Sequence, residues 1–167
     1  FRNYNDTRAS FVSGVNLLVG GNANGKTNLL EAIFYLSTGH AFRTRREQEL
    51  IRFGAEFAEL SAEVTAQERE QTLRAVLFSG RRPRQLWLNG VRQKTAAGFT
   101  GVVRCVLFCP EDLLVLKKGA APRRKLLDTM ICQLRPNYEA ALTEYQRLLE
   151  QKSALLRDRF ETPGLLE

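Results

Sequence analysis

The sequence predicts an α/β fold from three features: a strand, glycine loop and helix in succession, an alternating middle segment, and a helical C-terminal part. The chain has 167 residues, 44% of them hydrophobic, which is enough for one buried core. Residues 15–19 are apolar except for Asn16 and lie between two glycines, so we expect a buried strand there. Apolar residues then recur at helical spacing, which predicts a helix over 27–38 that ends at Gly39.

The middle of the chain changes to the two-residue period of a strand. Small or apolar residues alternate with polar ones over 58–64. Leu73, Ala75 and Leu77 recur at the same two-residue spacing, and Asn89-Gly90 follows a third apolar run. Asn-Gly between two strands is a strong hairpin signal. We therefore expect an antiparallel meander, followed by a buried strand at 102–108.

The rest of the chain is predicted to be helical. We expect a short helix over 111–118, a second over 123–134 that Pro136 ends, and a long one over 138–157. Apolar residues in the long segment recur about every 3.5 residues. That period is typical of a helix that enters a coiled coil or packs on a partner helix, and the segment is too short to choose between them.

A glycine-rich loop precedes the first predicted helix. It reads GGNANGKT and matches G-x-x-x-x-G-K-[ST] in full. The residues expected to surround bound phosphates are Gly20, Gly21, Asn22, Ala23, Asn24, Gly25, Lys26 and Thr27. Lys26 would reach the β- and γ-phosphates and the Thr27 hydroxyl would ligate Mg²⁺. The sequence thus predicts a nucleoside triphosphate site with Mg²⁺, and an ordinary glycine turn is the alternative.

Hydrolysis would also require an apolar strand that ends in an acidic residue, known as the Walker B motif. The best candidate is the segment 106–112, but Pro110 precedes its two acids. Glu111 and Asp112 therefore have two open interpretations: they are first-turn helix charges or they lie near the metal. No convincing Walker B motif is present.

Charge and composition restrict the class of partner. A net charge of +7 and a pI of about 9.7 indicate a polyanion partner, nucleic acid first, and from composition alone a solvated basic surface is an equal alternative. No segment approaches the roughly 20 apolar residues of a membrane span, and no signal region is visible, so we expect a cytoplasmic protein without a membrane partner. Three cysteines and one histidine predict neither a zinc site nor a disulfide framework. We expect Cys105 and Cys132 to be small buried residues.

Basic side chains gather in places suited to contacts with DNA phosphates. One group of candidates follows the helix expected over 27–38, and another lies at 117–124. They are Arg43, Arg45, Arg46, Lys117, Lys118, Arg123 and Arg124. A third group, over 81–84, is less favoured because hairpin turns are often basic for solubility. For each group a solvated face is the alternative.

Several stretches together resemble the RecF family of bacterial recombination-repair ATPases, which is related to SMC-type ABC heads. They are, in chain order, FRNY at 1–4, GGNANGKTNLLEAI at 20–33, TGHAFRT at 38–44 with ELI at 49–51, LNG at 88–90, FCPED at 108–112, and RR with LD within 123–128. The resemblance covers nearly the whole chain, and the combination is far more specific than any single motif.

The resemblance implies an α/β P-loop NTPase fold, the N-terminal half of an ABC/SMC-type ATPase head with an antiparallel β-subsheet. Residues 1–135 would form the head lobe and 136–167 would begin a helical arm. It implies ATP as the nucleotide and Arg2 as a further candidate beside it. In the family the Walker B and signature motifs lie in the C-terminal half, so we expect no hydrolysis by these residues alone.

The resemblance also implies a cellular role. It implies an ATP-dependent homodimer that acts on single-stranded or gapped DNA or on a single/double-strand junction, with other recombination mediator proteins, in replication, recombinational repair and the SOS response. The alternative is a nucleotide- or DNA-binding module of another SMC-like protein without catalysis of its own. A P-loop kinase or GTPase is disfavoured because such enzymes continue as βαβ units.

Overall fold

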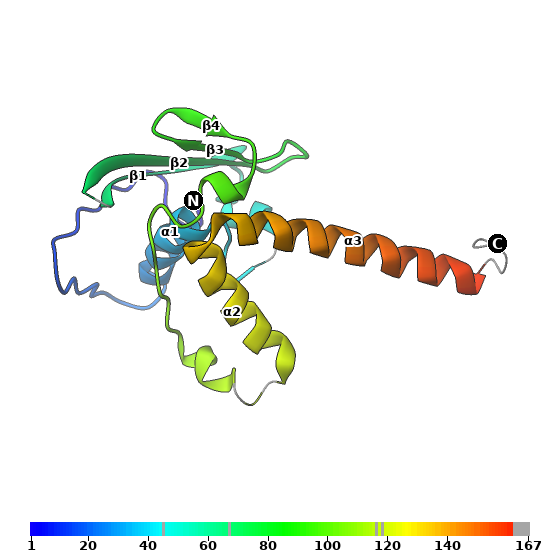
Figure 1. Ribbon diagram of the computed structural model, residues 1–167. Helices are drawn as coiled ribbons and strands as arrows, with labels where there is room; N and C mark the ends of the chain where they lie inside the picture. The colour runs from blue at the N-terminus through cyan, green and yellow to red at the C-terminus, as the bar shows by residue number, and fades with distance from the viewer. Residues whose placement is uncertain (45, 67, 116, 118, 162–167) are drawn as a thin grey trace.

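The computed structural model describes residues 1–44, 46–66, 68–115, 117 and 119–161. A four-stranded sheet lies over helix α1, α2 descends from this body, and α3 extends away from it (Figure 1). The helices are α1 (Lys26–Thr38), α2 (Ala120–Leu134) and α3 (Pro136–Glu161), with short 3₁₀ helices η1 (Glu47–Leu50), η2 (Ala96–Gly98) and η3 (Pro110–Leu114). The strands are β1 (Phe57–Ala66), β2 (Arg69–Phe78), β3 (Gln85–Leu88) and β4 (Val91–Gln93).

The predicted antiparallel meander is confirmed. The strands pair in chain order, and β1 and β2 run antiparallel from Phe57↔Phe78 to Ala66↔Arg69. Alternation buries one face of the sheet, so that Leu73 and Leu77 are almost fully enclosed. Between β3 and β4, Asn89 and Gly90 adopt φ values of 51° and 76°, as the predicted hairpin turn requires.

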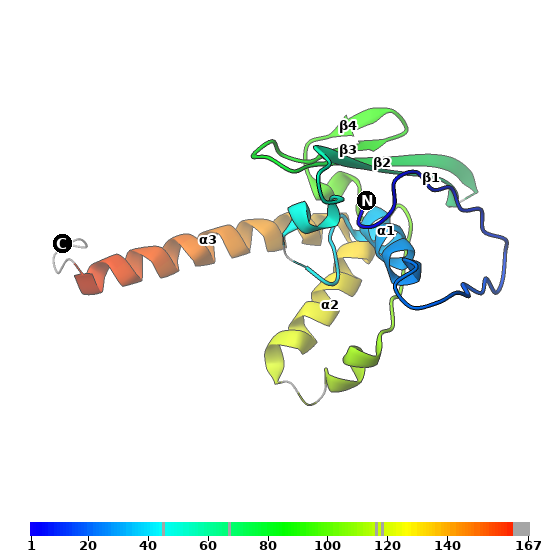
Figure 2. The ribbon, with the colours of Figure 1, turned by 180° about the vertical axis from the view of Figure 1, so that it is seen from behind.

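The core lies between the buried face of the sheet and α1. Tyr35, Phe99 and Leu50 are fully buried there. The Tyr35 hydroxyl donates to Glu47 Oε1 at 2.8 Å, and Arg84 forms an ion pair with the same carboxylate. Burial raises the pKa of Tyr35 above its usual value. These contacts join η1 to α1, which lies beneath the sheet in the view from behind (Figure 2), and they give Arg84 of the 81–84 group a structural position.

Two predicted strands are absent from the part of the chain that the structure describes. Segments 15–19 and 102–108 are assigned no strand. Val15 is 93% exposed and Val106 is 92% exposed, and Val102 and Val103 are only partly buried against the core. A strand needs a paired neighbour, and no described residue pairs with either segment. Apolar composition predicts that a segment could join a sheet, but it does not supply the partner.

The helical predictions are right in kind and differ in their ends. The helix expected over 27–38 is α1, and the one expected over 123–134 starts earlier, at Ala120. In place of a helix over 111–118 there is η3, which ends at Leu114; residues 116 and 118 lie outside the described residues. The long C-terminal helix spans Pro136–Glu161.

Only the first turns of α3 pack on the body. Glu139 is buried and its Oε1 lies 3.1 Å from His40 Nε2. Farther along, the side chains of Tyr145, Leu148 and Leu155 are about half exposed. In the described residues, no helix has the length and hydropathy needed to cross a membrane.

Gly101 provides a test of how α2 is packed. Its φ is +82°, and an added Cβ would lie 2.4 Å from the Gln133 backbone oxygen. Gly54 has a φ of +80° and open space around it. We expect Gly54→Ala to cost about 1 kcal/mol through backbone strain alone, and Gly101→Ala to cost a further ~1–3 kcal/mol through overpacking. Denaturant unfolding measures both, and equal losses would contradict the close contact.

Candidate functional site

The predicted phosphate-binding loop, residues 20–27 (the P-loop), lies at the N-terminus of α1. Residues 20–24 are exposed, Gly25 is the N-cap with a φ of 88°, and α1 begins at Lys26. The Lys26 ammonium donates to the backbone oxygens of Gly20 and Gly21, each at 2.7 Å. The structure therefore brings the eight predicted residues together around one helix terminus.

This arrangement suits an anion. The first N–H groups of a helix have no helical acceptor, and the helix dipole adds positive potential at the same end. Lys26 adds a full positive charge that can turn from the loop carbonyls toward a ligand, and Thr27 lies exposed on the first turn. A triphosphate that carries Mg²⁺ fits these groups, because P-loop metal sites take most ligands from phosphate and water.

The N-terminal segment 1–4 packs against the P-loop. The Tyr4 hydroxyl donates to the Gly25 backbone oxygen at 3.0 Å, and Asn28 Nδ2 donates to Asn3 Oδ1 at 2.7 Å. Sequence reasoning missed these contacts. The motif resemblance placed FRNY ahead of the P-loop, but no spacing rule indicated that the two segments touch.

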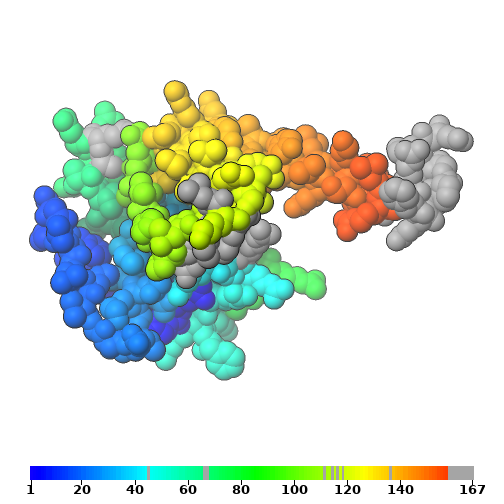
Figure 3. Space-filling view, turned by 90° about the horizontal axis from the view of Figure 1, so that it is seen from below, coloured from blue at the N-terminus to red at the C-terminus, as the bar shows by residue number. Residues whose placement is uncertain are grey.

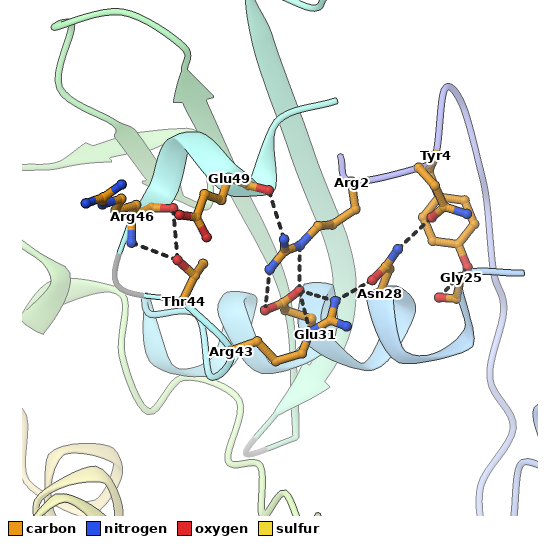
Figure 4. Close-up of polar contacts among 10 residues, drawn as sticks. Arg2, Tyr4, Gly25, Asn28, Glu31, Arg43, Thr44, Arg46 and Glu49 are labelled. Carbon is orange, nitrogen blue, oxygen red and sulfur yellow. Dashed lines mark hydrogen bonds and ion pairs between the residues drawn. The ribbon is translucent and has the colours of Figure 1, made fainter. Parts of the chain in front are cut away.

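Glu31, on α1, is the electrostatic centre of this region. Its carboxylate is fully buried and accepts from Arg2 Nε at 2.8 Å and from Arg43 Nη2 at 2.7 Å. Figure 4 shows the two guanidinium groups converging on this carboxylate. Burial alone would raise the pKa of Glu31, but the hydrogen bonds from Arg43 and Arg2 hold it below its usual value.

Two predicted binding residues therefore have structural partners. Arg2, a candidate near the nucleotide, is held by Glu31 and also donates to the Glu49 backbone oxygen at 2.9 Å. Arg43, a candidate for DNA, bonds to Glu31 and to the Asn28 side chain. Its side chain remains 37% exposed, so one guanidinium edge still faces solvent.

The other DNA candidates differ in setting. Arg46 is exposed just before η1, with its backbone N–H donating to Thr44 Oγ1 at 3.0 Å. Lys117, Arg123 and Arg124 lie around the start of α2, where Lys117 and Arg124 are exposed and Arg123 is partly exposed. The start of α2 is in front in the view from below (Figure 3). Arg45 and Lys118 lie outside the described residues.

One of the two acidic residues after Pro110 caps the start of a helix. Asp112 Oδ2 accepts from the Cys109 backbone N–H at 2.7 Å at the start of η3. This contact favours the first-turn interpretation of Asp112; the Glu111 side chain is outside the described ones. Among the described residues, no group of three His, Cys, Asp or Glu side chains is placed to hold a metal.

The cysteines are partly as expected. Cys132 is buried, as predicted, and burial raises the pKa of its thiol to about 12. Cys105 is only half-buried, and burial raises the pKa of its thiol as well. A thiol with a raised pKa is a poor nucleophile at neutral pH, so neither group suggests covalent chemistry.

Comparison with known proteins agrees with this geometry. The family model described as AAA domain matches residues 1–100. The DNA replication and repair protein RecF of Symbiobacterium thermophilum is 39% identical over 167 residues, which covers 99% of this chain and 44% of that relative. The same-named protein of Lacticaseibacillus casei is 37% identical over 158 residues, covering 94% and 42%. The chain thus spans less than half the length of these relatives.

Solved structures give the same result. A structure of the recombination mediator protein RecF-ATPrS in the RecFOR pathway matches with a TM-score of 0.89 and 33% identity, over 98% of this chain and 44% of that one. A structure of RecF-ATP in the same pathway matches with a TM-score of 0.79 and 34% identity, over 95% and 43%. The chain therefore belongs to the AAA domain family, and its α/β fold matches that of the RecF ATPase head.

Proposed function

We propose that this chain binds ATP with Mg²⁺ through residues 20–27 and forms the N-terminal head part of a RecF-type DNA replication and repair protein. The observation that carries the proposal is the P-loop itself: a left-handed Gly25 ahead of α1, with Lys26 folded over the loop. A RecF-ATPrS structure matches nearly the whole chain at a TM-score of 0.89, which supports ATP as the nucleotide.

Each P-loop residue would have a distinct role. The N–H groups of the exposed residues 20–24 and the N-terminus of α1 would hold the phosphates without any change of charge state. Lys26 would exchange two neutral carbonyl acceptors for charged phosphate oxygens, so that both partners in the hydrogen bond would be ionised. Thr27 would supply one oxygen to Mg²⁺. Arg2 would act mainly through Glu31, because that carboxylate already binds it.

Hydrolysis would require more than these residues. We propose that ATP joins two heads into a homodimer and that hydrolysis releases them. The chain spans about 42–44% of the length of its RecF relatives, so the groups that activate water would come from the remainder of such a protein. The described residues supply a nucleotide cradle and no grouped acidic ligands.

DNA would be the polyanion that the net charge of +7 attracts. The exposed guanidinium groups of Arg46, Arg123 and Arg124 would contact phosphates, together with Lys117 and the free edge of Arg43. Single-stranded, gapped or junction DNA would be the substrate, with other recombination mediator proteins as partners in replication, recombinational repair and the SOS response. Such a role places the protein in the cytoplasm.

Residues 1–135 would form the head lobe, and 136–167 would begin the arm. The first turns of α3 contact the body and the described side chains beyond them are mostly exposed, which supports a boundary at the start of α3. The tail from 162 lies outside the described residues.

Replacing Lys26 with alanine tests nucleotide binding. We expect MgATP affinity to fall on the order of 10–100-fold, because a charge-assisted hydrogen bond is worth roughly 1.5–3 kcal/mol. Titration calorimetry measures the affinity. Lys152→Ala, which removes an exposed charge from α3, is the matched control and should bind as the unchanged chain does. Unchanged binding by Lys26→Ala would overturn the P-loop assignment.

Turnover by the 167 residues alone tests the composite-site proposal. We expect phosphate release from MgATP to stay at the background level of the Lys26→Ala variant, because the proposal assigns the groups that orient water to the remainder of a RecF-type protein. A coupled phosphate assay at saturating MgATP measures it. Robust hydrolysis that Lys26→Ala abolishes would contradict the proposal that the remaining groups lie elsewhere.

The salt dependence of DNA binding tests the basic residues on α2. Log affinity should fall linearly with log salt, and removing Arg123 and Arg124 together should reduce that slope by about 1–2. Arg69→Ala with Arg92→Ala removes the same charge from the exposed meander and should leave the slope nearly unchanged. Anisotropy with a gapped oligonucleotide measures both. A flat salt response in the unchanged chain would refute phosphate contacts.

A further inference from the structure

Gly25 is the most crowded point of the P-loop. A Cβ added there would lie 2.8 Å from Asn3 Oδ1 and 2.9 Å from Tyr4 Cζ. At Gly20 and Gly21 an added Cβ would meet only the Asn24 side chain, at 3.5 Å or more. Gly25 therefore has a second constraint besides its φ of 88°: segment 1–4 lies directly against its α-carbon.

Two hydrogen bonds join this segment to the start of α1. The Tyr4 hydroxyl donates to the Gly25 backbone oxygen at 3.0 Å, and Asn28 donates to Asn3 at 2.7 Å. The Gly25 oxygen is also the first acceptor of α1, since the N–H of Leu29 donates to it at 3.0 Å. Tyr4 thus binds the carbonyl group that starts the helix, on the residue directly before Lys26.

Segment 1–4 is itself fixed to the body. Phe1 is buried in the core, and the Arg2 backbone N–H donates to the Leu50 oxygen at 2.6 Å. The Arg2 side chain adds the ion pair with Glu31 at 2.8 Å. Because segment 1–4 is held at these points, its contacts with Gly25 and Asn28 can restrict the motion of the P-loop. Residues 20–24 of that loop are exposed.

We propose that Asn3 and Tyr4 are positioning residues of the phosphate site. They hold Gly25 in its left-handed conformation and fix the direction of the first turn of α1, from which Lys26 and Thr27 extend. This inference rests on the proposed binding of MgATP to the P-loop. Asn3 and Tyr4 act on the nucleotide through the loop backbone, because their polar atoms are already bound to Asn28 and Gly25. Losing either contact leaves the loop intact but less well ordered before binding.

Tyr4→Phe is the sharpest test because it removes one hydroxyl and keeps the ring. Tyr138→Phe is the matched control: it removes a hydroxyl that donates to Asp128 Oδ1 at 2.6 Å, between α2 and α3. We expect Tyr4→Phe to weaken MgATP affinity about fivefold, the equivalent of one net hydrogen bond, and Tyr138→Phe to leave it unchanged. Titration calorimetry on the full 167-residue chain measures the affinities.

A second measurement needs no nucleotide. Amide hydrogen exchange over 22–27 should be several-fold faster in Tyr4→Phe than in the unchanged chain, and β1 and β2 should exchange as before. Asn3→Ala should have the same local effect. Asn16→Ala is its control, because the Asn16 side chain bonds only to backbone atoms of its own loop, around Val12 and Gly14.

The outcomes separate the two proposals. Unchanged affinity and unchanged loop exchange in Tyr4→Phe would overturn the positioning role. Equal losses of affinity in Tyr4→Phe and Tyr138→Phe would also overturn it, because they would report a general loss of stability. If the unchanged chain and Lys26→Ala bind MgATP equally, nucleotide binding at the P-loop fails instead. Loop exchange in Tyr4→Phe then still decides whether segment 1–4 orders the loop.

Discussion

The ion pairs of the buried Glu31 carboxylate are the interactions on which this structure most depends. A lone charge in the interior would cost several kcal/mol, and Arg2 and Arg43 offset that cost from two different segments. Arg2 comes from the N-terminal segment and Arg43 from the chain that leaves α1. One side chain on α1 thereby fixes both flanks of the helix. Because removal of one partner from such a group commonly costs about 3–5 kcal/mol, the three residues act as a unit.

Helix α1 lies between the P-loop and segments that come later in the chain. Its N-terminus carries Lys26 and the P-loop, and its last turn is bonded to later segments. Ser37 Oγ lies 2.7 Å from the Val103 backbone oxygen and 3.0 Å from Gln133 Oε1, and its single proton is donated to one of them at a time. Thr100 donates from its hydroxyl to the Thr38 backbone oxygen at 3.0 Å. Helix α1 thus has the P-loop at one end and hydrogen bonds to later segments, including α2, at the other.

The sequence predicts those elements that local periodicity and turn chemistry determine. The helix after the P-loop and the meander with its Asn89-Gly90 turn follow from residues close together in the chain, so both are confirmed. Segments 15–19 and 102–108 have the composition of strands, but pairing depends on neighbours that composition does not identify. Asn3, Tyr4, Glu31 and Arg84 escaped prediction for a related reason. Their partners lie 12 to 49 residues away, and no pattern rule identified these pairs.

The burial of Glu139 gives α3 a mechanical property. A helix of 26 residues is about 39 Å long. It is joined to the body near one end, through Glu139 and His40, and its described side chains farther along are mostly exposed. Such a helix would move as a rigid rod about the contact between Glu139 and His40. A tilt of about 10° at this contact moves its far end by ~7 Å, given a rise of 1.5 Å per residue. A small rearrangement at the Glu139 contact would therefore move the far end of α3 by a larger distance.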